Sequence, residues 1–326
     1  MKKVIVTGIN GLIGQYISKP LKDLDFEVYG IGRKDFITDK FNYINCDINN
    51  SLETKNLFKE IKPQYLIHLA WDTNKGYLES DDNFDLVASS INMLKYFREN
   101  GGKKALFTGT CFEYKFKDYP IKEEDELKPN TIYAKCKNYL REISELYCYK
   151  NNIDFCWARI FYTYGKNENN KRLFPQIING LKNNQKVSIN HSHLKRDYIF
   201  AGDVAKAISL VLNSKFNGII NICSGKSISL ENIAITIAKK LNKLELLDLK
   251  KLETKEPDSI VGDNSILLNN FNFNYREIEN FICSDNVDYV NLFVLNFNKI
   301  VSFIVLFYIL ILILSEINYK NINFKA

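Results

Sequence analysis

The chain has 326 residues, enough for one large α/β unit or two modest domains. Its hydrophobic fraction of 46% argues against an intrinsically disordered protein. The formal net charge of +6 comes from lysines that mostly alternate with acidic residues, as in 22–27 and 122–128. A solvated surface is therefore favoured over a nucleic-acid-binding patch, and no nucleic-acid partner is expected.

Cysteines and histidines also limit the possible functions. The seven cysteines form no CxxC pair and mostly stand in apolar runs, which indicates reduced, buried thiols of a cytoplasmic protein. They are Cys46, Cys111, Cys136, Cys148, Cys156, Cys223 and Cys283. His191 and His193 have no acidic or cysteine cluster beside them, so we expect a loop pair and no metal. The N-terminal apolar run in MKKVIVTG is too short for a signal peptide.

Strands and helices are predicted to alternate along the first half of the chain. Continuous apolar, β-branched runs predict buried strands, and helical spacing predicts helices between them. The predicted strands are 2–8, 26–33, 41–48, 65–71, 103–110 and 155–165, and the predicted helices are 11–24 (bent or shortened by Pro20), 51–61 (with Ser51 as N-cap), 83–99 and the segment around Tyr133. This alternation predicts an α/β fold with a Rossmann-type, doubly wound parallel sheet.

The second half has a mixed pattern. Segments 186–190, 196–212 and 218–224 read as a strand, a strand leading into a helix, and a strand. We therefore predict a dinucleotide-binding domain over 1–165, to which a later segment at about 196–220 returns. Residues 166–283 are expected to form mainly a smaller, mixed α/β substrate-binding region.

The stretch VTGINGLIG places three glycines where the first strand meets a helix. Gly8 permits a tight turn, Gly11 lets the backbone approach a pyrophosphate, and Gly14 lets helix and strand pack closely. The amides at the start of the helix then face the anion. The stretch predicts a dinucleotide site, with a glycine-rich turn that binds nothing as the alternative.

Five motifs in order carry a family resemblance from residue 2 to roughly 280. They are TGxxGxxG, IHLAW (67–71), FTGTCFEY (107–114), Tyr-x-x-x-Lys, and RDYIFAGDVAKAI (196–208) with NICSG (221–225). Together they resemble the extended short-chain dehydrogenase/reductase superfamily, in its nucleotide-sugar epimerase/dehydratase/reductase branch. The resemblance implies an NAD(P)-dependent enzyme that acts on a nucleotide-activated sugar.

Tyr133 and Lys137 stand four residues apart in TIYAKCKNYL, so in a helix their side chains share a face. The lysine cation favours the phenolate and is expected to lower the pKa of Tyr133 from about 10. Such a tyrosine can exchange a proton with a sugar hydroxyl while a hydride moves to or from nicotinamide. The resemblance further implies that Lys137 bonds the nicotinamide ribose and that Thr110 orients the substrate oxygen. In isolation the pair would read as surface residues.

The residues after Thr110 depart from relatives that dehydrate their sugar. Those relatives have Asp and Glu directly after the threonine, as the acid and base for eliminating water. Here Cys111 and Phe112 follow, and neither can serve. Glu113 comes one position late and points the other way if the strand pleat continues. We therefore predict no 4,6-dehydratase activity.

Cofactor choice depends on the end of the second strand, where NAD-selective folds commonly place an acid. This strand ends in YGIGRKD, and Arg33 with Lys34 suits a 2′-phosphate. NADP is therefore favoured over NAD; the alternative is that Arg33 stacks on adenine. Asp47, in the family's "D-hydrophobic" position, would bond adenine in either case. The expected cofactor-binding residues are Thr7, Gly8, Asn10, Gly11, Leu12, Ile13, Gly14, Arg33, Asp47, Ile48, Leu69, Ala70, Tyr133 and Lys137.

The substrate residues come from the resemblance alone. Arg196 of RDYIF matches an arginine that binds the nucleotide diphosphate. Tyr162 stands where many relatives have Asn, so the role of this position stays open. Phe174 resembles a segment lying along the nucleotide base, and Asp263 falls near a family acidic position. The expected substrate-binding residues are Thr110, Tyr162, Phe174, Arg196 and Asp263.

The C-terminal extension, 284–326, does not match the family pattern. Residues 300–314 form an almost wholly apolar run of fifteen residues, shorter than the roughly 17–25 of a spanning helix. The run is read as a membrane anchor, a buried or oligomer-forming helix, or an extension unrelated to the catalytic fold. Membrane contact through 300–314 therefore stays open.

Together these features predict a cytoplasmic, homodimeric NAD(P)-dependent enzyme acting at C4 of a nucleotide-sugar. A 4-keto-6-deoxy-sugar reductase is the first hypothesis, because Arg33 favours NADPH and the dehydratase acids are missing. A nucleotide-sugar 4-epimerase with retained NAD is the alternative. A non-catalytic NADP-sensing or scaffold protein is a third, although such proteins usually lose Tyr133 or Lys137.

Overall fold

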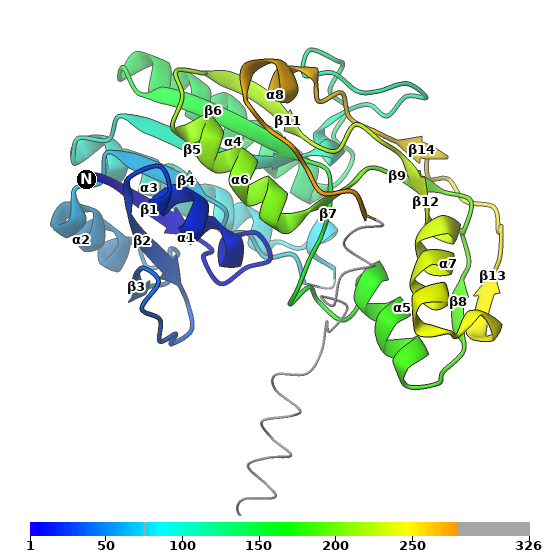
Figure 1. Cartoon of the computed structure of the whole chain (residues 1–326). Helices are drawn as coiled ribbons and strands as arrows, with labels where there is room; N and C mark the ends of the chain where they lie inside the picture. Colours follow the sequence, from blue (N-terminus) through cyan, green and yellow to red (C-terminus); the bar gives the residue numbers. More distant parts are fainter. Residues whose placement is uncertain (75, 279–326) are drawn as a thin grey trace, which may run out of the picture.

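A seven-stranded parallel sheet forms the centre of the computed structural model, which describes residues 1–74 and 76–278 (Figure 1). The strand order is β11-β6-β5-β4-β1-β2-β3. From β1 the chain first adds β2 and β3 on one side and then β4, β5, β6 and β11 on the other side, as in dinucleotide-binding folds. Its strands are β1 (Lys2–Thr7), β2 (Phe26–Gly32), β3 (Asn42–Asn45), β4 (Tyr65–His68), β5 (Lys104–Thr110), β6 (Asp154–Ile160) and β11 (Gly218–Ile222). The predicted α/β class and doubly wound parallel sheet are confirmed.

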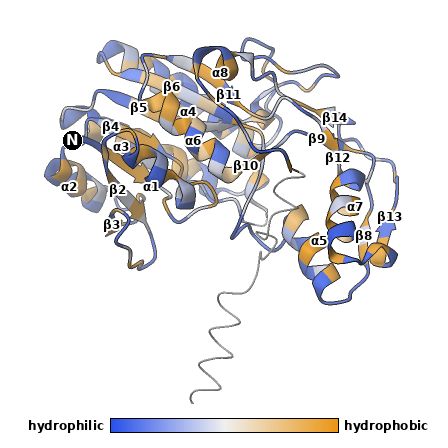
Figure 2. Ribbon diagram, viewed as in Figure 1, coloured by the Kyte–Doolittle hydropathy of each residue, from blue (hydrophilic) through white to orange (hydrophobic). Residues whose placement is uncertain are grey.

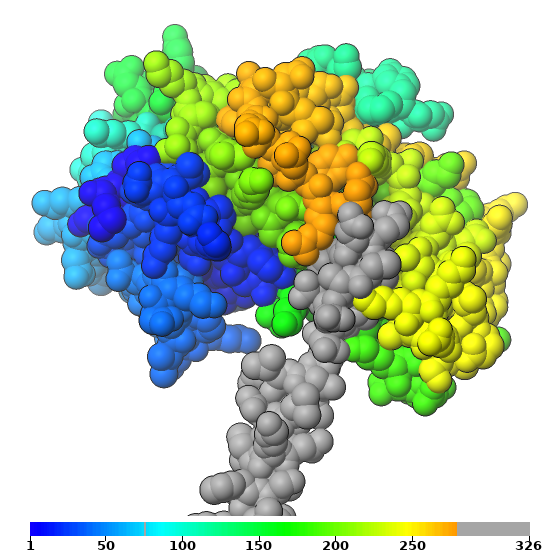
Figure 3. All heavy atoms as spheres, in the orientation of Figure 1, coloured from blue at the N-terminus to red at the C-terminus, as the bar shows by residue number. Residues whose placement is uncertain are grey.

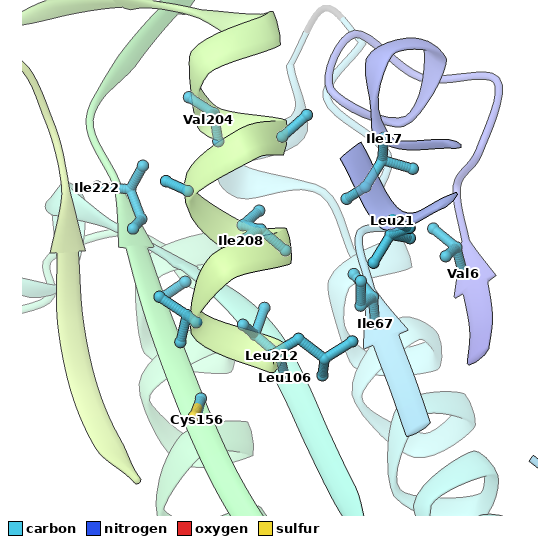
Figure 4. Close-up of a cluster of buried hydrophobic side chains, with 14 of the residues drawn as sticks. Val6, Ile17, Leu21, Ile67, Leu106, Cys156, Val204, Ile208, Leu212 and Ile222 are labelled. Carbon is cyan, nitrogen blue, oxygen red and sulfur yellow. The ribbon is translucent and has the colours of Figure 1, made fainter. Parts of the chain in front are cut away.

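Helices cover both faces of the sheet, which explains the continuous apolar runs of its strands. Along β1, Val4 and Val6 belong to the core under one set of helices, whereas Ile5 belongs to the core under the other. In Figure 4, Val204 and Ile208 of α6 lie among side chains of α1 and the strands. One face carries α1 (Gly14–Lys22) and α6 (Ala201–Leu212), and the other carries α2 (Ser51–Ile61), α3 (Asp82–Glu99) and α4 (Ile132–Lys150).

Two helix starts show how local signals act. Thr131 caps α4 by accepting a 3.1 Å hydrogen bond from the Ala134 amide, which fixes the first turn that holds Tyr133. The predicted cap of α2 is wrong by one residue: Asn50, not Ser51, accepts the bond, from the amide of Glu53 at 3.2 Å. Pro20 lies inside α1, which ends at Lys22.

The strand predicted over 155–165 is in fact two strands that belong to different sheets. β6 ends at Ile160, Phe161 belongs to neither strand, and β7 (Tyr162–Tyr164) pairs with β10 (Tyr198–Phe200). This change of partner brings Tyr162 out of the main sheet and into the region between the sheet and the second lobe.

A smaller lobe lies at one side of the sheet, on the right in Figure 1. Its helices α5 (Leu173–Lys182) and α7 (Leu230–Leu241) share a core that includes Ile177, Leu181 and Ile233. Its strands are β8 (Val187–Ile189), β9 (Lys195–Arg196), β12 (Ile228–Ser229), β13 (Leu247–Leu249) and β14 (Ser259–Ile260). Figure 2 shows apolar residues concentrated along the central strands and on parts of the helices, and buried apolar side chains form the cores of both parts.

The remaining short elements lie within the two parts. They are α8 (Ser265–Asn270) and the 3₁₀ helices η1 (Tyr77–Glu79), η2 (Cys111–Glu113) and η3 (Leu244–Leu246). In the space-filling view of Figure 3, the orange end of the described chain lies between the blue N-terminal part and the yellow lobe. α8 packs beside β11.

The C-terminal predictions, including the extension 284–326, its apolar run 300–314 and Cys283, lie outside the described residues. Across 1–74 and 76–278, none of the helices is both long and apolar enough to cross a membrane. In the same ranges, no group of three or more His, Cys, Asp or Glu side chains is arranged to hold a metal. The six described cysteines are buried and free.

Candidate active site

The glycine turn after β1 packs too closely to accept side chains. Gly8 has φ +69°, and a Cβ added there would lie 2.8 Å from the amide nitrogen of Ala70. A Cβ at Gly14 would lie 2.3 Å from the Gly8 carbonyl oxygen. The turn, which is closed by a 2.9 Å bond from the Gly11 amide to Gly8, leads directly into α1. Such a turn at a helix N-terminus fits a diphosphate.

A cavity of about 280 Å³ opens beside this turn. It brings together residues that the sequence analysis assigned to the cofactor, from the ends of β1, β2, β3 and β4. Its lining consists of Gly8, Asn10, Gly11, Ile31, Gly32, Arg33, Lys34, Cys46, Asp47, Ile48, Asn49, Leu69, Ala70, Trp71, Asp72 and Leu86. The carboxyl ends of parallel strands and a glycine cradle are a fitting site for a dinucleotide.

Two predicted cofactor residues have more specific places. Arg33 follows the last residue of β2, its side chain is 64% exposed, and its nearest carboxylate oxygen is on Asp72 at 3.9 Å. Thr7 does not face the cavity: it is fully buried, its hydroxyl contacts His68 Nδ1 at 2.7 Å, and it accepts a bond from the Ala70 amide. Thr7 therefore supports the cavity wall through its hydrogen bond with Ala70, which lines the cavity.

A second cavity, of about 450 Å³, adjoins the first, since Gly8, Gly11, Leu69 and Trp71 line both. Leu12, Ile13 and Gly14 also line it. It contains the three predicted catalytic residues, Thr110 from the end of β5 and Tyr133 and Lys137 from the first turns of α4. Helical spacing therefore does place the tyrosine and the lysine on one wall, next to the glycine-lined cavity.

Burial dominates the ionisation of Tyr133 and Lys137. It raises the pKa of Tyr133 above its ordinary value, and the hydrogen bond with Thr110 lowers it by less. Burial also lowers the pKa of Lys137 to about 7, against the opposing effect of Glu113. Lys137 Nζ donates a 2.8 Å bond to the Thr108 carbonyl. The prediction that Lys137 lowers the pKa of Tyr133 is thus not met, because desolvation of the phenol raises that pKa and Lys137 is not among the groups that shift it.

Glu113 points into the protein interior. Residues 111–113 form η2, so the strand pleat on which its predicted direction rested does not continue past Thr110. The Glu113 carboxylate is fully buried and accepts bonds from the Thr110 amide at 2.8 Å and from Arg159 Nε at 2.7 Å. The two residues after Thr110 that line the cavity are Cys111 and Phe112, and neither has a carboxylate. Glu113 does not line this cavity.

Arg196 and Tyr162 lie on the lobe side. Arg196 is 2% exposed and lines a further cavity of about 360 Å³ with Tyr162 and Tyr198, both of which also line the catalytic cavity. Its guanidinium donates to Glu256 Oε2 at 2.7 Å. Tyr162 and Tyr198 thus lie between the catalytic cavity and the cavity that Arg196 lines.

Phe174 and Asp263 do not line these cavities. Phe174 is fully buried and stacks on Tyr164 with ring centroids 4.8 Å apart, because it lies on the apolar face of α5; its neighbour Leu173 lines the catalytic cavity instead. Asp263 precedes α8, and its carboxylate accepts a 2.8 Å bond from the Ser265 amide. The proposed substrate roles of Phe174 and Asp263 are not supported.

Three side chains of the catalytic cavity were missed from the sequence. Trp71 and Tyr77 pack edge-on against Tyr133, with ring centroids 6.2 Å and 5.0 Å away. Glu168 has one carboxyl oxygen, Oε2, that is buried without a hydrogen-bond partner in the described part of the chain, and burial raises its pKa to about 8. The one available signal was an aromatic residue at the end of a predicted strand, as at Trp71.

Comparison with known proteins agrees with this geometry. The model of the NAD dependent epimerase/dehydratase family matches residues 4–223. The dTDP-4-dehydro-6-deoxyglucose reductase of Escherichia coli is 29% identical over 269 residues, covering 74% of this chain and 82% of its own. The dTDP-6-deoxy-L-talose 4-dehydrogenase (NAD(+)) of Aggregatibacter actinomycetemcomitans is 26% identical over 234 residues, covering 70% and 86%.

Solved structures show the same fold. The UDP-glucose 4-epimerase of Thermus thermophilus, in complex with NAD, superposes with a TM-score of 0.78 at 19% identity, covering 88% of this chain and 98% of its own. The UDP-glucose 4-epimerase of Thermotoga maritima, with UDP-glucose, gives a TM-score of 0.79 at 17% identity, with the same two coverages of 88% and 98%.

Proposed function

We propose a function from the premise that this chain belongs to the NAD dependent epimerase/dehydratase family. It reduces the 4-keto group of a 6-deoxy sugar carried on a nucleoside diphosphate, with NADPH as the reductant. One observation carries the proposal: Thr110, Tyr133 and Lys137 line the same cavity, and this cavity adjoins the glycine-lined cavity.

The protonation of Tyr133 suits reduction. When bound, the dinucleotide supplies the hydride for the carbonyl carbon. Burial raises the pKa of Tyr133, so its phenol holds a proton at neutral pH and can donate it to the developing C4 oxygen. The Thr110 hydroxyl lies beside that phenol and can hold the same oxygen. Two lysines among the described residues line this cavity, Lys137 and Lys171. The Lys137 ammonium donates a hydrogen bond to the Thr108 carbonyl.

NADP is our proposed cofactor because of the end of β2. Arg33 and Lys34 line the first cavity there, and β2 itself ends in Gly32 rather than an acid. A 2′-phosphate would accept charge-assisted hydrogen bonds from Arg33. These bonds would replace the weak ion pair of Arg33 with Asp72, whose charged atoms are 3.9 Å apart. Asp47 and Ile48 line the same cavity and are proposed to contact adenine.

A nucleotide-sugar is the proposed substrate. Arg196 is proposed to bind its diphosphate, in exchange for the Glu256 carboxylate, which is 60% exposed and free to move into water. Tyr162 is proposed to contact the sugar, since it lines the cavities on both sides. The curated relative from Escherichia coli, named as a 4-dehydro-6-deoxyglucose reductase, supports this substrate class. The inward direction of Glu113 supports the absence of 4,6-dehydratase activity.

We also propose that the enzyme is a cytoplasmic homodimer. α4 exposes apolar side chains at helical spacing on its outer face, which is typical of an association surface. They are Tyr139, Ile143, Leu146 and Tyr149, all at least 48% exposed. Buried free cysteines support a reducing compartment.

The decisive experiment incubates purified protein with a panel of 4-keto-6-deoxy nucleotide-sugars and NADPH or NADH. A reductase consumes one reduced cofactor for each 4-hydroxy sugar formed, measured by cofactor absorbance and product NMR. A 4-epimerase with retained NAD would interconvert 4-hydroxy nucleotide-sugars with no net consumption. A sensor or scaffold protein would do neither.

A further inference from the structure

Trp71 stands where the two cavities of the active site meet. It comes three residues after the end of β4, and its side chain lines both the glycine-lined cavity and the catalytic cavity. No assigned step of the proposed reaction uses it. An indole at this junction lies between the cofactor half and the proton-transfer half of the site.

The indole contacts the catalytic lysine directly. Lys137 Nζ lies 3.6 Å from the centre of the Trp71 ring. The same nitrogen donates to the Thr108 carbonyl, and in the described ranges no carboxylate pairs with it. The Lys137 ammonium is therefore held between one carbonyl oxygen and one aromatic face, which attracts cations through its quadrupole.

A buried asparagine fixes the orientation of the indole. Trp71 Nε1 donates a 2.8 Å bond to Asn83 Oδ1, and Asn83, on α3, is 2% exposed. The Asn83 amide also donates to the carbonyls of Tyr77 and Ser80, both at 2.7 Å. The Asn83 side chain thus fixes the orientation of the Trp71 ring. It also fixes the segment 77–80, from which Tyr77 packs against Tyr133. An aromatic surface held in this way is preorganised.

We propose that Trp71 is a positioning residue for Lys137: the indole, oriented by Asn83, holds the lysine ammonium on the Thr108 carbonyl and beside Tyr133. The proposal rests on the proposed function, in which Lys137 is catalytic. Lysine has a long, flexible stem, and without the ring its ammonium would turn toward water in the open cavities. Trp71 then acts on turnover through Lys137 and leaves binding of the nucleotide-sugar unchanged.

The first test measures the contact itself. The chain has two tryptophans, and the difference in fluorescence between wild type and Trp71→Phe isolates Trp71. Lys137 has a pKa of about 7, and of its charged neighbours His68 has a pKa of about 3 while burial raises the pKa of Tyr133. Glu113 is paired with Arg159. Glu168, whose pKa burial raises to about 8, lines the same cavity, and its titration is unaffected when Lys137 is replaced by Met. We expect a transition near pH 7 in the Trp71 signal that Lys137→Met removes. A Trp71 signal with the same pH dependence in wild type and in Lys137→Met overturns the proposal, because the ammonium then does not contact the ring.

The second test measures turnover with the 4-keto nucleotide-sugar and NADPH. Trp71→Leu, which keeps an apolar side chain without a π face, is expected to lower kcat about tenfold or more, while KM for the nucleotide-sugar changes less than about twofold. Trp71→Phe keeps a ring and should recover most of kcat. Equal losses in the two variants, or no loss in either, would show that Trp71 does not position Lys137.

Lys137→Met separates the failure of this proposal from that of the proposed function. If Lys137→Met is inactive while Trp71→Leu retains full kcat, the reaction stands and the positioning role is refuted. If Lys137→Met is as active as wild type, Lys137 is not catalytic, and the proposed mechanism and the role of Trp71 are refuted together.

Discussion

Glu113 and Arg159 form an ion pair inside the protein, with Oε2 and Nε 2.7 Å apart and side chains 0% and 1% exposed. The carboxylate also accepts bonds from Trp157 Nε1 at 3.1 Å and from the Thr110 amide at 2.8 Å. Arg159 in turn donates to the Tyr114 hydroxyl at 2.9 Å. The pair therefore ties the end of β5, which carries Thr110, to β6. The pair thereby fixes the position of Thr110, which is proposed to orient the substrate oxygen.

Glu113→Gln is expected to destabilise the fold, because it leaves the Arg159 cation buried without a counter-charge. Breaking one side of a buried pair costs about 3–5 kcal/mol. The measurement is the free energy of unfolding from urea titration. The control is Glu126→Gln, in the exposed pair with Lys115, where side chains are 52% and 64% exposed and the change should stay below about 1 kcal/mol. Equal changes in both variants would contradict the prediction.

The strand-and-helix order followed from the sequence because its signals are local. Val4, Ile5 and Val6 are apolar on both sides of the strand, and only a sheet covered on both faces buries them all. The break at Phe161 could not be foreseen, because it depends on distant partners. The Phe161 amide bonds Ile222, and the next amide, of Tyr162, bonds Asp197.

Helix periodicity could predict that Tyr133 and Lys137 lie on one helix face, but it could not predict what surrounds them. Whether Leu173 or Phe174 faces the cavity depends on how α5 packs on Tyr164, which is a tertiary contact. The direction of the pKa shift at Tyr133 depends on burial, which residue spacing does not encode. The contact between Trp71 and Lys137 could not be predicted either, because it is a tertiary contact between residues 66 positions apart in the sequence.

Arg33→Ala is expected to weaken NADPH binding about tenfold to a hundredfold and leave NADH binding unchanged. The range corresponds to the loss of charge-assisted bonds to the 2′-phosphate, about 1.5–3 kcal/mol. Calorimetric titration with each cofactor gives the two dissociation constants. A parallel loss for NADPH and NADH would instead indicate that Arg33 stacks on adenine, and tighter NADH than NADPH binding by wild type would reverse the proposed preference.

Tyr133→Phe should lower kcat by about a hundredfold to ten-thousandfold, the usual contribution of a positioned general acid. The ring contacts with Trp71 and Tyr77 remain in this variant, so folding and cofactor binding should be retained. Tyr139→Phe, on the exposed side of the same helix, is the matched control and should turn over like wild type. Turnover in Tyr133→Phe equal to that of an active wild type would show that Tyr133 is not the general acid.

Ile143→Lys should convert the proposed homodimer to a monomer, because it places a charge in the middle of the apolar face of α4. Sedimentation equilibrium measures the change in mass. Ile37→Lys, at an apolar residue that is fully exposed away from α4, should leave the mass unchanged. A wild-type protein that is monomeric at all accessible concentrations would refute the dimer.

Lys137 should make the stability of the enzyme depend on pH. Burial lowers its pKa from an ordinary 10.5 to about 7, so between these values the unfolded chain binds more protons than the folded one. The free energy of unfolding contributed by this group therefore rises with pH across that window, by on the order of a few kcal/mol. Lys137→Met should remove this rise.

The comparison requires a lysine on the same helix that stays in water. Lys135→Met removes an exposed ammonium two positions away, so its unfolding free energy should follow that of wild type from about pH 7 to 10. Ionisation of the buried cysteines and tyrosines affects all three proteins alike and cancels in the differences. If the wild-type and Lys137→Met curves run parallel, the Lys137 ammonium is not desolvated, and the cavity wall that holds it is more open to water than its 2% exposure implies.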